Sequence, residues 1–74
     1  MFENFSNFVR RMGKNKIKLS LLSNESAFAV LFFQKEDADR RWKCVALNSN
    51  MQLNPESRQE IIELGLKKIK FYQE

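Results

Sequence analysis

The fold is decided by a stretch in which cations or serine alternate with aliphatic residues, and it reads Lys16-Ile17-Lys18-Leu19-Ser20-Leu21-Leu22. An alternation of period two is typical of a strand with one buried face and one open face. The apolar parity holds Ile17, Leu19 and Leu21, so these side chains are predicted to face the core. The lysines of the other parity then lie on the open face of a sheet.

The next segment is a continuous apolar run at Ala27–Phe33, separated from the first strand by a polar turn at 23–26. A run that is apolar on both parities suits a central strand. If the loop contains only residues 23–26, Leu22 pairs with Ala27 in an antiparallel hairpin. This register predicts a core face made of Ile17, Leu19, Leu21, Phe28, Val30 and Phe32. It leaves Phe33 on the open face.

A third strand is expected from Arg41 to Leu47, after a charged turn at 34–40. Burial of its unpaired cations would be costly, so the opposite parity should join the core. That inward parity holds Trp42, Cys44 and Ala46. A short fourth strand is expected at Met51–Leu53, after an Asn-Ser-Asn turn.

Helices are predicted at both ends of the chain. The three-and-four spacing of apolar residues predicts a short helix over residues 2–12, ended by Gly13. The apolar residues that define this helix are Phe2, Phe5, Phe8, Val9 and Met12. The segment Asn54-Pro55-Glu56 provides an N-cap, a first-turn proline and a first-turn acid, and it predicts the start of a long C-terminal helix. Gly65 lies within the apolar arc of that helix, which indicates a close approach to the sheet.

Together these segments predict one α+β domain over residues 1–74, in the order α-β-β-β-(β)-α. Three or four antiparallel strands form a meander, and the long C-terminal helix and the short N-terminal helix pack on one face. Cys44 is the only thiol, and we expect it to be a small buried apolar residue. A domain of this size without disulfides depends on its packing or on a partner subunit.

The composition argues against catalysis. The chain has 74 residues and no His, so it lacks the usual general base and the usual nitrogen ligand of zinc. We therefore expect a protein that is not an enzyme and that has no cofactor and no metal centre. Residues 1–5 contain neither a basic leader nor an apolar segment, and the longest apolar run has the length of a strand. We expect a cytoplasmic or nuclear protein without membrane association.

Cations gather on the predicted open face, around an aromatic ring. The formal net charge is +4, which favours an anionic partner. Lysine and arginine neutralise phosphates, and an aromatic ring offers a stacking plane to a base, so the face is suited to single-stranded DNA or RNA. The predicted binding residues are Lys16, Lys18, Phe33, Arg41 and Lys43 on the sheet, with Arg10, Arg11 and Lys14 before the first strand.

Two other interpretations of this surface remain open. Lysine on an open sheet face also serves solubility and blocks aggregation. The same face contains apolar residues, which indicates burial in a homodimer. The alternative function is therefore a protein-interaction module, a small regulator or inhibitor of the phage or mobile-element type. Such a module would dock an apolar or Phe-rich surface on a larger protein.

The junction Leu53-Asn54-Pro55-Glu56, which follows a basic meander, resembles the single-stranded-DNA-binding domain of positive-cofactor-type transcriptional coactivators. The resemblance covers the element order of about residues 16–70 but only these four residues in sequence. It implies a dimer that binds single strands across a curved sheet, with that role on Lys16, Lys18, Arg41 and Lys43. The predicted first helix and the turn between the second and third strands depart from the family pattern, which leaves membership open.

Overall fold

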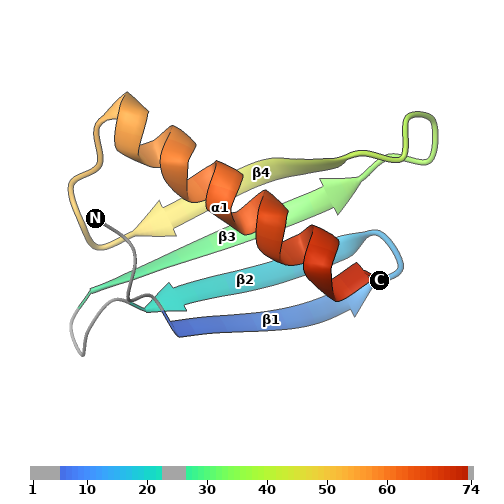
Figure 1. The fold of residues 1–74 in the computed structure, drawn as a ribbon, viewed down its shortest axis with the longest axis horizontal. Coiled ribbons are helices and arrows are strands. Elements are labelled where there is room, and N and C mark those ends of the chain that lie inside the picture. The colour runs from blue at the N-terminus through green and yellow to red at the C-terminus, as the bar shows by residue number, and fades with distance from the viewer. Residues whose placement is uncertain (1–5, 23–26, 74) are drawn as a thin grey trace.

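The computed structural model describes residues 6–22 and 27–73, which form an antiparallel sheet followed by one helix (Figure 1). The elements are β1 (Ser6–Gly13), β2 (Lys16–Leu22), β3 (Phe28–Lys35), β4 (Trp42–Ser49) and α1 (Pro55–Gln73). The strand order is β1-β2-β3-β4, so each strand pairs with its neighbour in sequence. The α+β class, the antiparallel meander and the C-terminal helix are therefore confirmed.

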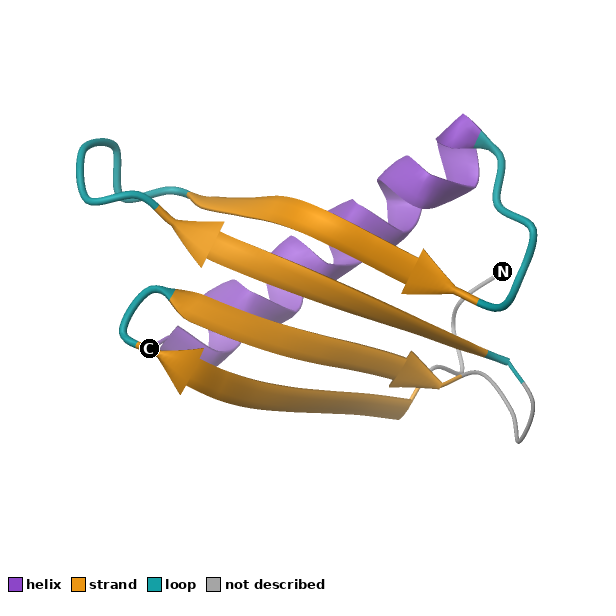
Figure 2. Ribbon diagram, turned by 180° about the vertical axis from the view of Figure 1, so that it is seen from behind, coloured by secondary structure: helices purple, strands orange, loops and turns teal. Residues whose placement is uncertain are grey.

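Helix α1 lies across one face of the sheet and crosses the strands diagonally, from the end of β4 towards the turn between β1 and β2 (Figure 1). Seen from behind, the other face has no described element over it (Figure 2). We call it the open face. Within the described residues, α1 has no stretch that is long and apolar enough to cross a membrane.

The prediction of an N-terminal helix over residues 2–12 is wrong for residues 6–12, because residues 6–13 form strand β1. Residues 1–5 lie outside the described part of the chain. β1 pairs with β2 along its length, with Val9 opposite Leu19 and Arg10 opposite Lys18. Val9 packs against the core, whereas Phe8 is largely exposed. The apolar spacing of three and four residues favours a helix, but pairing with β2 stabilises a strand instead. The sequence of this segment alone does not encode that pairing.

The register between β2 and β3 differs from the prediction by one residue. Leu22 pairs with Phe28, and Ile17 pairs with Phe33. Because side chains alternate between faces, this shift exchanges the two faces of β3. The predicted inward positions of Ile17, Leu19 and Leu21 are confirmed. The buried residues of β3 are Ala29, Leu31 and Phe33 instead of Phe28, Val30 and Phe32. The turn at 23–26 lies outside the described residues.

Strand β4 carries a bulge opposite Phe32 and Phe33, because Phe32 pairs with Ala46 while Phe33 pairs with Cys44. The extra residue, Val45, is exposed. Since a bulge reverses the alternation of faces, Cys44 and Trp42 point towards the core as predicted, whereas Ala46 is exposed. The predicted fourth strand at Met51–Leu53 is not formed, and this segment leads into α1.

The start of α1 is confirmed by its cap. The side-chain oxygen of Asn54 accepts a hydrogen bond of 2.8 Å from the backbone N–H of Ser57. The carbonyl of Asn54 accepts the first intrahelical bond, 3.0 Å, from Arg58. The bond to Ser57 satisfies one of the first-turn N–H groups that have no partner within the helix.

Gly65 is the point of closest approach between α1 and the sheet. A Cβ atom built on Gly65 would lie 2.8 Å from Cζ of Phe33 and 3.1 Å from Cδ2 of Leu19. Ile61 and Ile69, one turn before and one turn after Gly65, are fully buried. The close approach predicted from the glycine in the apolar arc is therefore confirmed.

We expect Gly65→Ala to destabilise the domain, because the added methyl group would collide with a buried ring that has no room to move. Overpacking of this kind costs about 1–3 kcal/mol, whereas alanine in an open helix position would stabilise. Urea unfolding of both proteins measures the difference. In a Phe33→Leu background, which removes the colliding ring atoms, Gly65→Ala should cost clearly less. An equal cost in both backgrounds would contradict this packing.

Candidate nucleic-acid interface

The open face is organised in rows of residues that lie opposite each other across the strands. One row contains Arg10, Lys18, Phe32 and Ala46. The next row towards the turn between β1 and β2 contains Lys16, Gln34 and Lys43. The row on the other side contains Phe8, Ser20, Val30 and Asn48. Cations therefore lie towards one end of the open face and apolar side chains towards the other.

Arg10 and Lys18 are direct cross-strand neighbours, so two like charges face each other. Such a pair destabilises a sheet unless an anion lies nearby. The four strands contain no Asp or Glu. Among the described residues, no acid forms an ion pair with Arg10, Lys16 or Lys18. The positive charge at this end of the open face is thus not neutralised by the sheet.

The aromatic residue beside these cations is Phe32, which lies directly opposite Lys18 and is half-buried. Phe33, predicted to stack with a base, is 1% exposed and belongs to the core, where it faces Gly65. The physical reason is the one-residue shift in register described above. The structure therefore puts Phe32 on the open face, at the place predicted for Phe33.

The other predicted residues lie in three places. Lys16, Lys18, Arg10 and Lys43 share the open face. Arg11 pairs with Ile17, so it lies on the helix side of the edge strand β1. Lys14 lies in the exposed turn that joins β1 to β2. Arg41 precedes β4 and, with Trp42, lines a pocket beside α1. Arg11 and Arg41 are therefore not brought together with the lysines of the open face.

Lys43 is the one member of this group with acidic neighbours in the described structure. Its ammonium lies 3.5 Å from a carboxylate oxygen of Glu36 and 3.5 Å from one of Asp39. These carboxylates, Asp39 first, raise the pKa of Lys43. A phosphate would have to compete with both acids, so Lys43 is less available than Lys18.

The connection between β3 and β4 is ordered by its own acids. A hydrogen bond from the backbone N–H of Arg41, 3.1 Å long, lowers the pKa of Asp39, and the charge of Lys43 lowers it further. Asp37 accepts a hydrogen bond of 3.1 Å from the side chain of Asn15 in the neighbouring turn. The backbone N–H of Lys35 donates to the carbonyl of Asn15 at 2.9 Å. These bonds hold the two turns at this end of the sheet together.

Cys44 packs against the core, and burial raises the pKa of its thiol. The thiol donates a weak hydrogen bond to the carbonyl of Ala46, 3.4 Å away. A raised pKa keeps the nucleophilic thiolate scarce at neutral pH, so this cysteine is suited to packing. No cluster of metal-ligating side chains occurs within residues 6–22 and 27–73.

Sequence reasoning missed Phe32, Phe8 and the pocket at Trp42. No local signal identified Phe8 as a residue of a sheet face, because the apolar residues of 6–13 do not alternate. No local signal distinguishes Phe32 from Phe33, because both parities of that run are apolar. Comparison of the chain with protein-family models, curated proteins and solved structures gives no match.

We expect the turn between β3 and β4 to contribute stability only within a window of pH. Because the pKa of Asp39 is lowered, its contribution is present above the ordinary value of 3.8 and is lost as the pH falls through the lowered value. Because the pKa of Lys43 is raised, its contribution is present below 10.5 and is lost as the pH rises through the raised value.

Asp39→Asn keeps an acceptor for Arg41 but removes the charge. It should therefore lower the urea midpoint at pH 7 and leave it unchanged well below pH 3.8. In a Lys43→Ala background the effect at pH 7 should be smaller. A difference of the same size at both pH values would contradict the assigned role of the charge.

Proposed function

We propose that this protein is a non-enzymatic binding protein that contacts single-stranded nucleic acid through the open face of its sheet. The observation that carries the proposal is the row in which Arg10 and Lys18 lie beside Phe32. The two cations would bind phosphates, and the ring would stack with a base. Because any base has a stacking face, this arrangement favours binding without strong sequence preference.

The distribution of charge supports the proposal. Among residues 6–22 and 27–73, acidic residues are absent from the four strands and lie in the turn after β3 and along α1. An extended chain of phosphates could cross the sheet without meeting a carboxylate on the strands. Lys16 lies next to this row and offers a further phosphate contact. Lysine used only for solubility does not need an opposed cation and an adjacent aromatic ring.

The order of elements gives further support. Four strands followed by one helix agree with the strands-then-helix order of the coactivator family that the junction at 53–56 resembles. With β1 in place of the predicted helix, one of the two departures from that family pattern is removed. Because that family forms dimers, the resemblance also supports the proposal of a dimer.

We expect Lys18→Ala to weaken the binding of a fluorescent single-stranded oligonucleotide and to reduce the salt dependence of its affinity. Each phosphate contact to a single strand contributes about 0.7 to the slope of log K against log salt, so that slope should fall by about this amount. Fluorescence anisotropy at several salt concentrations measures both effects.

The matched control is Lys67→Ala, which removes an equal charge from an exposed position on α1. Its slope should stay close to that of the unchanged protein. Phe32→Leu should weaken binding without changing the slope, because stacking releases no counterions. Absence of binding at low salt, or equal effects of Lys18→Ala and Lys67→Ala, would overturn the proposal.

A second candidate function is favoured by the apolar end of the open face. Leu22 and Phe28 pair directly and are 46% and 39% exposed, and Phe8, on the same face, is 60% exposed. A contiguous exposed patch of this kind on a small domain is typical of a protein interface. The candidate is association through this patch, with a second copy of the chain or with a larger protein.

For self-association, we expect Phe8→Ser to shift nuclease-treated protein towards the monomer in sedimentation equilibrium. Val45→Ser is the matched control, because Val45 is 59% exposed but lies in the bulge of β4 and outside this patch. Equal sedimentation of both variants and the unchanged protein would exclude a dimer through the patch.

A further inference from the structure

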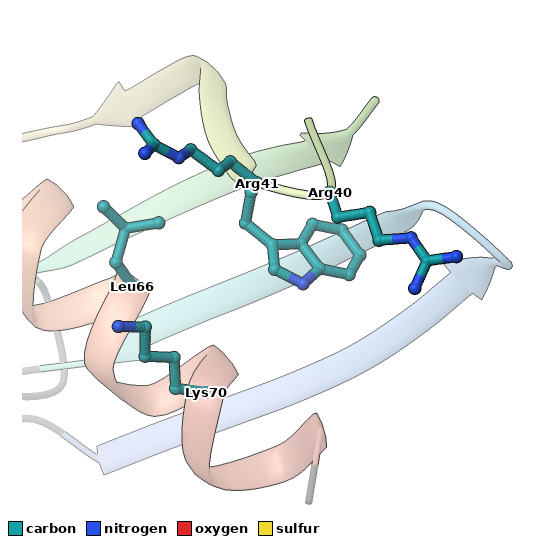
Figure 3. Close-up of a pocket in the computed structure, with 5 residues that line it drawn as sticks. Arg40, Arg41, Leu66 and Lys70 are labelled. Atoms are coloured by element: carbon teal, nitrogen blue, oxygen red, sulfur yellow. The ribbon is translucent and has the colours of Figure 1, made fainter. Parts of the chain in front are cut away.

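A pocket of about 510 Å³ lies on the helix side of the sheet, at the start of β4 (Figure 3). It is lined by Arg40, Arg41, Trp42, Leu66 and Lys70. The first three belong to the connection before β4 and to its first residue, and the last two belong to α1. Its volume is within the range of about 300–1,000 Å³ that is typical of small-molecule sites.

The pocket follows from the diagonal path of α1. The helix starts next to the end of β4 and moves away from that strand as it crosses towards β1 (Figure 1). The helix therefore covers the last residues of β4 but not the first residues of that strand. Leu66 and Lys70, in the second half of α1, form the opposite wall. This corner is separate from the open face, which lies on the other side of the sheet.

Three of the five lining side chains are cations, and no acid lines the pocket. The acids of the adjacent connection are engaged elsewhere. Asp37 accepts a hydrogen bond from Asn15, while Glu36 and Asp39 are paired with Lys43. Within the part of the chain that the structure describes, no carboxylate forms an ion pair with the cations of the pocket. Asp39 accepts a hydrogen bond from the backbone N–H of Arg41, and the charge of Arg41 helps to lower the pKa of Asp39, so an anion at Arg41 would have this carboxylate nearby.

Trp42 provides a planar aromatic wall. The ammonium of Lys35 lies 5.6 Å from the centre of its ring, and Lys35 does not line the pocket. The side chains of Arg40 and Arg41 extend in different directions, and Lys70 approaches from α1 (Figure 3). The cations are thus distributed around the pocket and do not converge on one point. This arrangement suits a ligand that is both planar and anionic.

The backbone at Arg40 is held in an unfavourable conformation. Its φ is 55°, in the left-handed region that glycine adopts most easily, and its N–H donates a bond of 2.9 Å to the carbonyl of Glu36. Such conformations in residues other than glycine concentrate at ligand-binding positions. An arginine at this position is less stable than glycine would be, but its side chain places a guanidinium group at the rim of the pocket.

We propose that this pocket binds a nucleoside phosphate, with the base stacked on Trp42 and the phosphate bound by Lys70, while Arg40 and Arg41 add positive charge at the rim. An indole stacks with any base, and guanidinium and ammonium groups are the usual partners of phosphate. The ligand is a free nucleotide or the phosphorylated end of a strand. The site does not depend on nucleic-acid binding at the open face.

The chain contains one Trp, so its fluorescence reports on the pocket directly. We expect adenosine monophosphate to quench the fluorescence of Trp42 in a saturable way at low salt. Adenosine lacks the phosphate and inorganic phosphate lacks the base, so both should bind more weakly. The absence of saturable quenching by the nucleotide would overturn the proposal, and so would equal binding of inorganic phosphate.

Two variants test the cations. Lys70→Ala should raise the dissociation constant by about tenfold, the order expected for one charge-assisted hydrogen bond. Lys67→Ala, which removes the same charge outside the pocket, is its control. Arg40→Gly should weaken binding while the urea midpoint stays unchanged or rises, because glycine suits the left-handed backbone. Equal effects of Lys70→Ala and Lys67→Ala would show that only net charge acts and would overturn the proposed role of Lys70.

The source of the ligand is distinguished with two oligonucleotides of one sequence, one carrying a 5′-phosphate and one not. Both are added to protein with Lys18→Ala and Phe32→Leu, which weaken the open face. Stronger quenching by the phosphorylated strand would assign the pocket to strand ends. Quenching by the mononucleotide alone would assign it to free nucleotides. If neither quenches, the pocket proposal fails, whatever the open face binds.

Discussion

The structure depends on the contact between Gly65 and the ring of Phe33. Because Gly65 has no side chain, α1 approaches the sheet closely enough for Ile61 and Ile69 to be buried on either side of it. The ring of Phe33 occupies the space that a side chain at position 65 would need. Because the ring of Phe33 points towards the helix, Ala29 and Leu31, which share its parity on β3, also face the core. Phe32 is thereby directed to the open face, beside Lys18.

The two sides of the sheet carry cations in different settings. On the open face, Arg10 and Lys18 are opposed on neighbouring strands with no acid on the sheet to neutralise them. On the helix side, the diagonal path of α1 leaves the corner at Trp42 accessible, and Lys70 closes one wall of it. The acids of the turn between β3 and β4 pair with Lys43 and, within the described residues, form no ion pair with Arg10, Lys18 or the cations of the pocket. This charge distribution is the basis for proposing anionic partners on both sides.

Local patterns predicted the elements that carry their own signals. The alternation at Lys16–Leu22 predicted β2 and its buried parity, and the Asn54 cap predicted where α1 begins. Gly65 predicted the close approach of helix and sheet. Strand β1 was predicted as a helix because its apolar spacing fits a helix when taken alone. Its conformation is stabilised by hydrogen bonds to β2, which depend on the tertiary structure.

The sequence by itself determined the α+β class, the presence of a basic sheet and the positions of β2 and α1, because these follow from local periodicity, caps and the cations of the strands. Only the tertiary structure decided that Phe33 is buried and Phe32 is not, since a run that is apolar on both parities has no preferred face until something packs against it. The tertiary structure also brought Arg40, Trp42 and Lys70 to one pocket, because the path of a helix across a sheet depends on the shapes that meet between them.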